Sequence, residues 1–122
     1  MHFIINGKIK PYVRMTQRGK FVKANAMEYL ASKADIGYQL KNQMQMQGWS
    51  MLPSQTPLKL SVVFTVRERL HCADLDNQIK GLVDAAQGIV FNDDRWIDVI
   101  TASRRSGDEY STRLIVRELT DE

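Results

Sequence analysis

Residues 58–88 read LKLSVVFTVRERLHCADLDNQIKGLVDAAQG, and this stretch decides the fold. Its first part alternates apolar and more polar residues over Leu58–Val66, which predicts a strand with one buried face. Its last part, over Leu75–Ala86, carries apolar residues at helical spacing, and Gly88 is placed to end that helix. The stretch therefore predicts a strand that leads into an amphipathic helix.

The residues before this stretch indicate short strands and a longer helix. A strand is predicted near Phe3–Ile5, followed by a turn at Asn6-Gly7, a further strand from Ile9 onwards and a second turn at Gln17–Lys20. From Asn25 the pattern changes to a helix of about twenty residues. Gly48 is a plausible end for that helix.

The residues after it predict two further strands, Trp96–Arg104 and Tyr110–Glu118. The turn residues Ser106-Gly107-Asp108 lie between them, so the two strands are expected to form a hairpin. The order is strands, helix, strand, helix, strand hairpin. This order predicts an α+β fold in which two helices pack on a mixed sheet, with residues 1–122 forming a single domain.

Composition limits the classes of function. The chain has 122 residues, with 17 Lys and Arg against 14 Asp and Glu, and a net charge of +3. It has no apolar run of 18 or more residues, and its first residues alternate like a strand, so we expect neither a membrane span nor a signal peptide and place the protein in the cytoplasm. Zinc is not expected, because Cys72 is the single cysteine and His2 and His71 are the only histidines.

Charge is unevenly distributed along the chain. Basic residues gather in residues 8–23, at Arg67 and Arg69, and at Arg104 and Arg105. The last two, Arg104 and Arg105, could reach either DNA or solvent. Acidic residues gather in residues 74–98. An acidic centre among basic segments is typical of a metal-using nuclease, in which cations hold phosphates and carboxylates hold the metal.

Three aspartates are the candidate metal ligands. Asp74 and Asp76 lie two residues apart where the strand gives way to the helix, and at such a junction both side chains can converge on one cation. Asp94 follows the helix and can complete the site if the helix folds back beside the strand. Carboxylate oxygens are the hard ligands that Mg²⁺ needs.

Neighbouring polar residues leave alternatives open. Lys80 lies one helical turn after Asp76, where it either forms an ordinary surface pair or neutralises charge on a phosphate, and the spacing alone favours the pair. Asp84 either ligates the metal, orients Lys80 or is a solvated carboxylate. Asn77 either hydrogen-bonds a ligand or caps the helix.

The segment resembles the signature of the RusA family of Holliday-junction resolvases. That pattern is Asp-x-Asp-Asn, a Lys four residues after the second Asp, an Asp four residues further on, and an Asp-Asp pair after a short connection. The chain supplies these elements in order as Asp74-Leu75-Asp76-Asn77, Lys80, Asp84 and Asp93-Asp94. The length, basic N-terminal arm, long first helix and closing strands are also similar to the family.

The resemblance implies a Mg²⁺-dependent endodeoxyribonuclease, with Mn²⁺ expected to substitute for Mg²⁺. It implies a homodimer that binds branched DNA and resolves four-way junctions by paired symmetrical nicks, in phage recombination or in debranching DNA. The implied metal ligands are Asp74, Asp76 and Asp94, with Asp93 as a further candidate, and Lys80 assists at the phosphate. The cations expected to contact DNA are Arg14, Arg18, Lys20, Lys23, Arg67 and Arg69, with Asn77 and Asp84 beside the site.

Two other classes of function remain open at this stage. The first is a non-catalytic module that binds branched DNA and whose carboxylates only shape the fold or bind a structural cation. The second is a divalent-metal phosphohydrolase that acts on a small substrate. The cations around the acidic segment favour a long polyanion over a small substrate.

Overall fold

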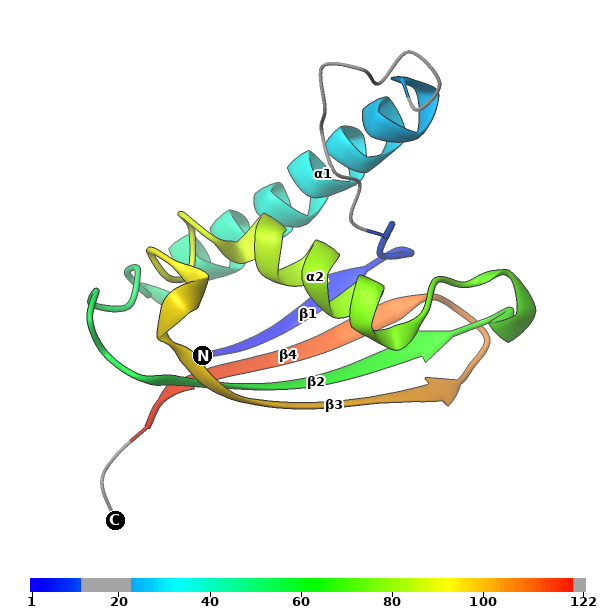
Figure 1. Cartoon of the computed structure of the whole chain (residues 1–122). Helices are drawn as coiled ribbons and strands as arrows, with labels where there is room; N and C mark the ends of the chain where they lie inside the picture. Colours follow the sequence, from blue (N-terminus) through cyan, green and yellow to red (C-terminus); the bar gives the residue numbers. More distant parts are fainter. Residues whose placement is uncertain (12–22, 120–122) are drawn as a thin grey trace.

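The computed structural model describes residues 1–11 and 23–119. Figure 1 shows both helices on the same face of the sheet, which confirms the predicted α+β fold. In chain order the elements are β1 (His2–Asn6), α1 (Lys23–Gln47), β2 (Leu58–Val66), a short 3-10 turn (Arg69–His71), α2 (Leu75–Ala86), a second 3-10 turn (Asp94–Trp96), β3 (Ile97–Ser106) and β4 (Ser111–Glu118).

The sheet has four strands in the order β1-β4-β2-β3. Strand β4 runs antiparallel to both of its neighbours, whereas β2 and β3 are parallel. The predicted hairpin between the last two strands is therefore wrong, because β2 lies between β3 and β4. Helix α2 supplies the crossover connection that two parallel strands require.

The turn between β3 and β4 crosses the end of β2. There the Gly107 N–H donates to the Val66 carbonyl oxygen at 3.0 Å. A Cβ atom on Gly107 would collide with the side chain of Thr65, so the close approach of the turn to β2 requires glycine. The turn residues were correctly recognised from the sequence, but they serve a crossing and not a hairpin.

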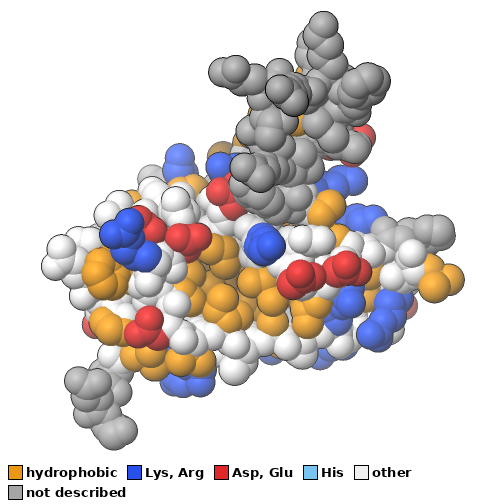
Figure 2. Space-filling view, viewed as in Figure 1, with side chains coloured by type: hydrophobic (Ala, Val, Ile, Leu, Met, Phe, Trp, Pro, Cys, Tyr) orange, Lys and Arg blue, Asp and Glu red, His pale blue; other side chains and the backbone are white. Residues whose placement is uncertain are grey.

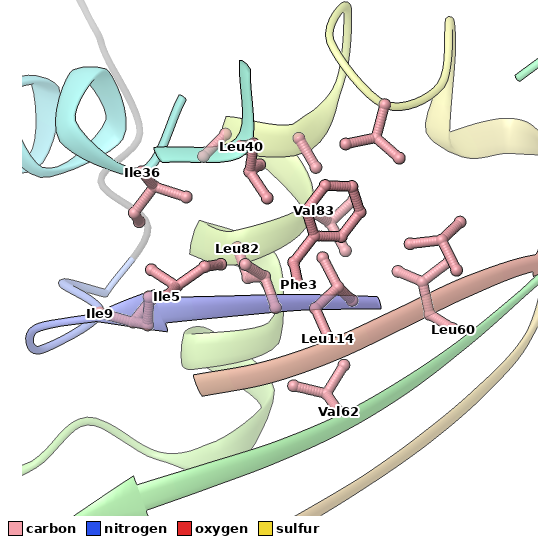
Figure 3. Close-up of a cluster of buried hydrophobic side chains, with 14 of the residues drawn as sticks. Phe3, Ile5, Ile9, Ile36, Leu40, Leu60, Val62, Leu82, Val83 and Leu114 are labelled. Carbon is pink, nitrogen blue, oxygen red and sulfur yellow. The ribbon is translucent and has the colours of Figure 1, made fainter. Parts of the chain in front are cut away.

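The core lies between the helices and one face of the sheet. The alternation of β2 is complete, with Leu58, Leu60, Val62, Phe64 and Val66 all buried. Figure 3 shows side chains from β1, β4, β2 and both helices meeting in this layer. Helix α2 spans the predicted residues, and its buried residues face the same core.

Helix α1 covers the outer edge of β1. The Gln43 side chain accepts from the Ile4 N–H at 3.0 Å and donates to the Ile4 carbonyl at 2.8 Å. Gln39 makes the same pair of bonds to Asn6, at 2.8 and 2.9 Å. Two glutamines one helical turn apart thus satisfy an edge that would otherwise present unpaired backbone groups.

The long helix differs slightly from its predicted bounds. It begins two residues before Asn25 and ends at Gln47, immediately before Gly48, whose φ of 71° is the left-handed conformation expected at a helix end. The strand predicted from Ile9 onwards is not formed over the described residues 9–11, where the chain has no regular structure. The remainder of that strand and the predicted turn at residues 17–20 lie outside the described residues.

Candidate active site

Helix α2 begins at two exposed carboxylates. Asp74 occupies the N-cap position, where its side chain makes no capping hydrogen bond, and Asp76 lies in the first turn. The positive end of the helix dipole favours carboxylates at these positions. Asn77 is inside the helix, so the structure contradicts its predicted capping role.

Arg104 fixes the chain just before these carboxylates. Its guanidinium donates to the Ala73 carbonyl oxygen at 2.7 Å and to the Cys72 sulfur at 3.3 Å. Successive residues of a strand point to opposite faces, so Arg104 lies on the helix side of the sheet and Arg105 lies on the other side. The sequence left the destination of both arginines open, although strand alternation separates them.

A groove runs between α2 and β3 beside this point. It encloses about 510 Å³ and is lined by Ile79, Lys80, Val83, Asp84, Gln87, Asp94, Ile97 and Ile100. Figure 2 shows hydrophobic side chains along its floor with acidic and basic groups around them. The groove thus brings together Lys80, Asp84 and Asp94, while Asp74 and Asp76 are not among its lining residues.

Asp94 stands at the start of the second 3-10 turn, with its N–H donating to Gln87 Oε1 at 3.2 Å. Partial desolvation raises the pKa of its carboxyl, and the hydrogen bond and charge of Asp93 and the charge of Asp84 raise it further. The pKa of Asp93 is lowered, chiefly by the hydrogen bond from the Arg95 N–H. The two neighbouring carboxyls therefore differ in how readily they ionise.

Asp84 is tied to α1. The Tyr29 hydroxyl donates to its carboxylate, and Lys33 Nζ lies 3.1 Å from the same oxygen. Asp84 therefore has partners that the sequence did not suggest, since Tyr29 and Lys33 lie some fifty residues earlier in the chain. No local signal identifies a contact between two helices at that separation.

Lys80 is exposed. The described residues form two ion pairs, Lys33–Asp84 and Arg95–Asp93, and Lys80 takes part in neither. The surface pair with Asp76, which the spacing favoured, is thus not formed. Its ammonium group is available at one side of the groove.

The predicted metal ligands are not assembled into one cluster. Within residues 1–11 and 23–119, no three His, Cys, Asp or Glu side chains are grouped in a way that could hold a metal ion. The carboxylates whose charge raises the pKa of Asp94, beside its partial desolvation, are Asp93 and Asp84.

The predicted DNA-binding cations are only partly visible. Arg67 and Arg69 are exposed on the connection between β2 and α2, which leads to Asp74. Lys23 is the first residue of α1, and its side chain is not described. Arg14, Arg18 and Lys20 lie outside the described residues.

The chain is similar to a known protein family over most of its length. The family described as Endodeoxyribonuclease RusA matches residues 6–117, nearly the whole chain. The chain belongs to the RusA family. Membership indicates an endodeoxyribonuclease of the kind that resolves Holliday junctions, and the matched range includes both the start of α2 and the groove.

No curated protein matches the chain at a significant level. RusA membership therefore rests on the match to the family as a whole. Among the described residues, neither helix has the length and apolar character needed to cross a membrane.

Replacing Asp94 by Asn should stabilise the ligand-free RusA protein near neutral pH. The raised pKa means that the folded protein binds this proton more tightly than the unfolded chain, so the free energy of unfolding falls as pH rises from below 3.8 through the raised value. Asn cannot ionise, so the gain should appear at pH 7 and vanish below about pH 3. It should stay below about 1 kcal/mol, because the side chain is exposed.

Urea unfolding at the two pH values measures this gain. Asp108→Asn, in the turn between β3 and β4, is the matched control for removing one carboxylate. An Asp94→Asn protein that is no more stable than wild type at pH 7 would contradict the electrostatic account of the groove.

Proposed function

We propose that this RusA protein is a Mg²⁺-dependent, structure-selective endodeoxyribonuclease that resolves four-way DNA junctions as a homodimer. The family match over residues 6–117 carries the proposal. The groove beside α2 supports it, since acidic side chains line it together with Lys80, which forms no ion pair with a described residue. DNA as the substrate favours action in the cytoplasm.

Asp74, Asp76 and Asp94 are the proposed ligands of Mg²⁺, with Asp93 as an additional candidate. Their oxygen donors are of the type that Mg²⁺ prefers. A cation would also offset the negative charges of Asp93 and Asp84, which raise the pKa of Asp94 together with the larger effect of desolvation. The side chains of Asp74 and Asp76 are exposed, so rotation about their side-chain bonds can redirect their oxygens. Bound Mg²⁺ would supply an activated water and offset charge on the phosphate.

The chain's own residues position the scissile phosphate. Lys80 would place a positive charge against the phosphoryl oxygens, where a preorganised cation in a partly desolvated groove acts more strongly than in water. Water attacks phosphorus, the bond to the 3′ oxygen breaks, and that oxygen receives a proton. The products are a 5′ phosphate and a 3′ hydroxyl, which a ligase can join.

Arg104 and Asp84 have positioning roles in this proposal. Arg104 holds the backbone at Ala73, and therefore determines where Asp74 begins α2. Asp84, held by Tyr29 and Lys33, fixes α1 against α2 and places a negative charge near Asp94. Neither role requires direct contact with the phosphate.

One observation favours a non-catalytic DNA-binding module as the second candidate. The described carboxylates do not form a three-ligand cluster, as they would in a metal centre formed in advance. In such a module the acidic residues would serve the fold alone, and cleavage would be absent with every divalent metal.

Cutting of a supercoiled plasmid that extrudes a cruciform tests the proposed paired nicking. A homodimer presents two sites related by a two-fold axis, matching the two equivalent strands of a junction. We expect linear plasmid as the first product in Mg²⁺, with little nicked circle accumulating. Accumulation of nicked circle before any linear product would contradict paired nicking by a dimer.

A further inference from the structure

The face of the sheet opposite the helices is not covered by any described element. Both helices pack on the other face (Figure 1). Strand register places four cross-strand rows on the uncovered face, which we call the open face. The rows are Asn6, Ser111, Thr65 and Arg105; Ile4, Arg113, Val63 and Ser103; His2, Ile115, Ser61 and Thr101; and Arg117, Lys59 and Val99.

Charge in the four rows of the open face has one sign. Its charged residues are Lys59, Arg105, Arg113 and Arg117, and none of the rows formed by the described strands contains an Asp or Glu. None of these four cations is in an ion pair within the described residues. All three arginines are exposed. The four rows therefore carry positive charge alone, and Asp98 lies outside them in the β3 bulge beside Val99. This positive excess favours a polyanionic partner.

A hollow in this face is suited to an anion. It encloses about 190 Å³ and is lined by Ile4, Val63, Thr65, Arg105, Ser111, Thr112 and Arg113. Arg105 Nε donates to Thr65 Oγ1 at 3.2 Å, which orients that guanidinium beside the hollow. Two guanidinium groups and a serine hydroxyl around one small hollow form a donor set suited to phosphate oxygens.

The cations extend along the face beyond this hollow. Arg113 and Arg117 lie four residues apart on β4, which corresponds to roughly 13 Å at about 3.3 Å per residue. A duplex presents phosphates about 3.4 Å apart along the axis on each strand, so this array can meet more than one phosphate. The array is thus directed at a polymer and not at a single small anion.

We propose that the open face binds the phosphate backbone of a duplex arm of the junction, away from the strand being cut. The inference rests on the proposed function and adds a second DNA contact to it. The carboxylates at α2 lie on the helix side of the sheet, so the open face cannot serve the same phosphate as Lys80. The cations of the open face would contact phosphates and not the edges of bases, so this contact should be independent of DNA sequence.

Salt dependence of junction binding separates this contact from the site. Binding is measured in EDTA, which prevents metal-dependent cutting, for wild type, Arg113→Gln and the double variant Arg113→Gln with Arg117→Gln. The slope of log affinity against log salt should fall by about 0.9 for each lost phosphate contact, so by roughly 2 in the double variant. Lys41→Gln, an exposed cation on α1, is the control and should leave the slope unchanged.

The outcomes distinguish the inference from the proposed function. A wild type that binds junctions, with slopes in the arginine variants equal to that of Lys41→Gln, overturns the open-face contact alone. A wild type that does not bind branched DNA at low salt overturns both. Sedimentation and thermal unfolding of each variant control for assembly and folding. A change in sedimenting mass in the arginine variants overturns the inference, because the face would then lie between two copies of the chain.

Discussion

Asp76→Asn should lower the rate of junction cleavage in Mg²⁺ by at least about 100-fold, while junction binding in EDTA stays within about twofold of wild type. Asn keeps the size of the side chain but loses the charge that a divalent cation requires. The side chain is exposed at the start of α2, so the fold should tolerate the change. Single-turnover cleavage and a gel-shift titration measure the two quantities.

Asp108→Asn provides the matched control for Asp76→Asn. It also removes one exposed carboxylate, but from the turn between β3 and β4. Its cleavage rate should equal that of wild type. Normal cleavage by the Asp76→Asn protein would remove Asp76 from the proposed ligand set, and equal losses in both variants would indicate a general effect of charge.

Lys80→Met should lower the cleavage rate at saturating DNA by about 100- to 1,000-fold, in the range found when one preorganised charge-stabilising group is removed. The ammonium lies along the groove and is not engaged in an ion pair with a described residue, so its loss should affect the phosphate and not the fold. Lys80→Arg should retain more activity than Lys80→Met, because the positive charge remains.

Separate measurements of the cleavage rate at saturating DNA and of the affinity for DNA decide the role of Lys80. A group that acts in the transition state changes the rate at saturating DNA, whereas a group that only binds the backbone changes affinity. Lys41→Met on α1 is the control for loss of one exposed lysine. A Lys80→Met protein with a normal rate and only weaker binding would contradict the catalytic assignment.

Strand β2 and helix α2 could be predicted from the sequence because each element shows a single hydrophobic periodicity. Strand β2 alternates without interruption over Leu58–Val66, and α2 carries its apolar face over Leu75–Ala86, with Asp74 at its N-cap position and Gly88 shortly after its end. Local pattern is sufficient where one face of an element is buried and the other is polar.

Strand pairing could not be predicted in the same way. Ser106-Gly107-Asp108 has the composition of a hairpin turn, but Gly107 crosses the end of β2, and β3 pairs with β2. The choice between pairing with β4 and pairing with β2 depends on contacts between residues about forty positions apart. Turn chemistry carries no information about such contacts.

The site was predictable in its residue types and not in its arrangement. The groove brings together Lys80, Asp84 and Asp94, which the sequence had singled out. The contacts of Tyr29 with Asp84 and of Arg104 with Ala73 join segments distant in the chain, so no local spacing predicts them. The convergence of Asp74 and Asp76 with Asp94 stays a prediction for the metal-bound protein.

The most direct test of the account is cleavage of a labelled synthetic four-way junction by the wild-type protein, beside a linear duplex with the sequence of its arms, in Mg²⁺ and in EDTA. We expect paired nicks in the junction in Mg²⁺, none in EDTA, and an intact linear duplex under both conditions. Junction binding without cutting in Mg²⁺ or Mn²⁺, or equal cutting of the linear duplex, would contradict it.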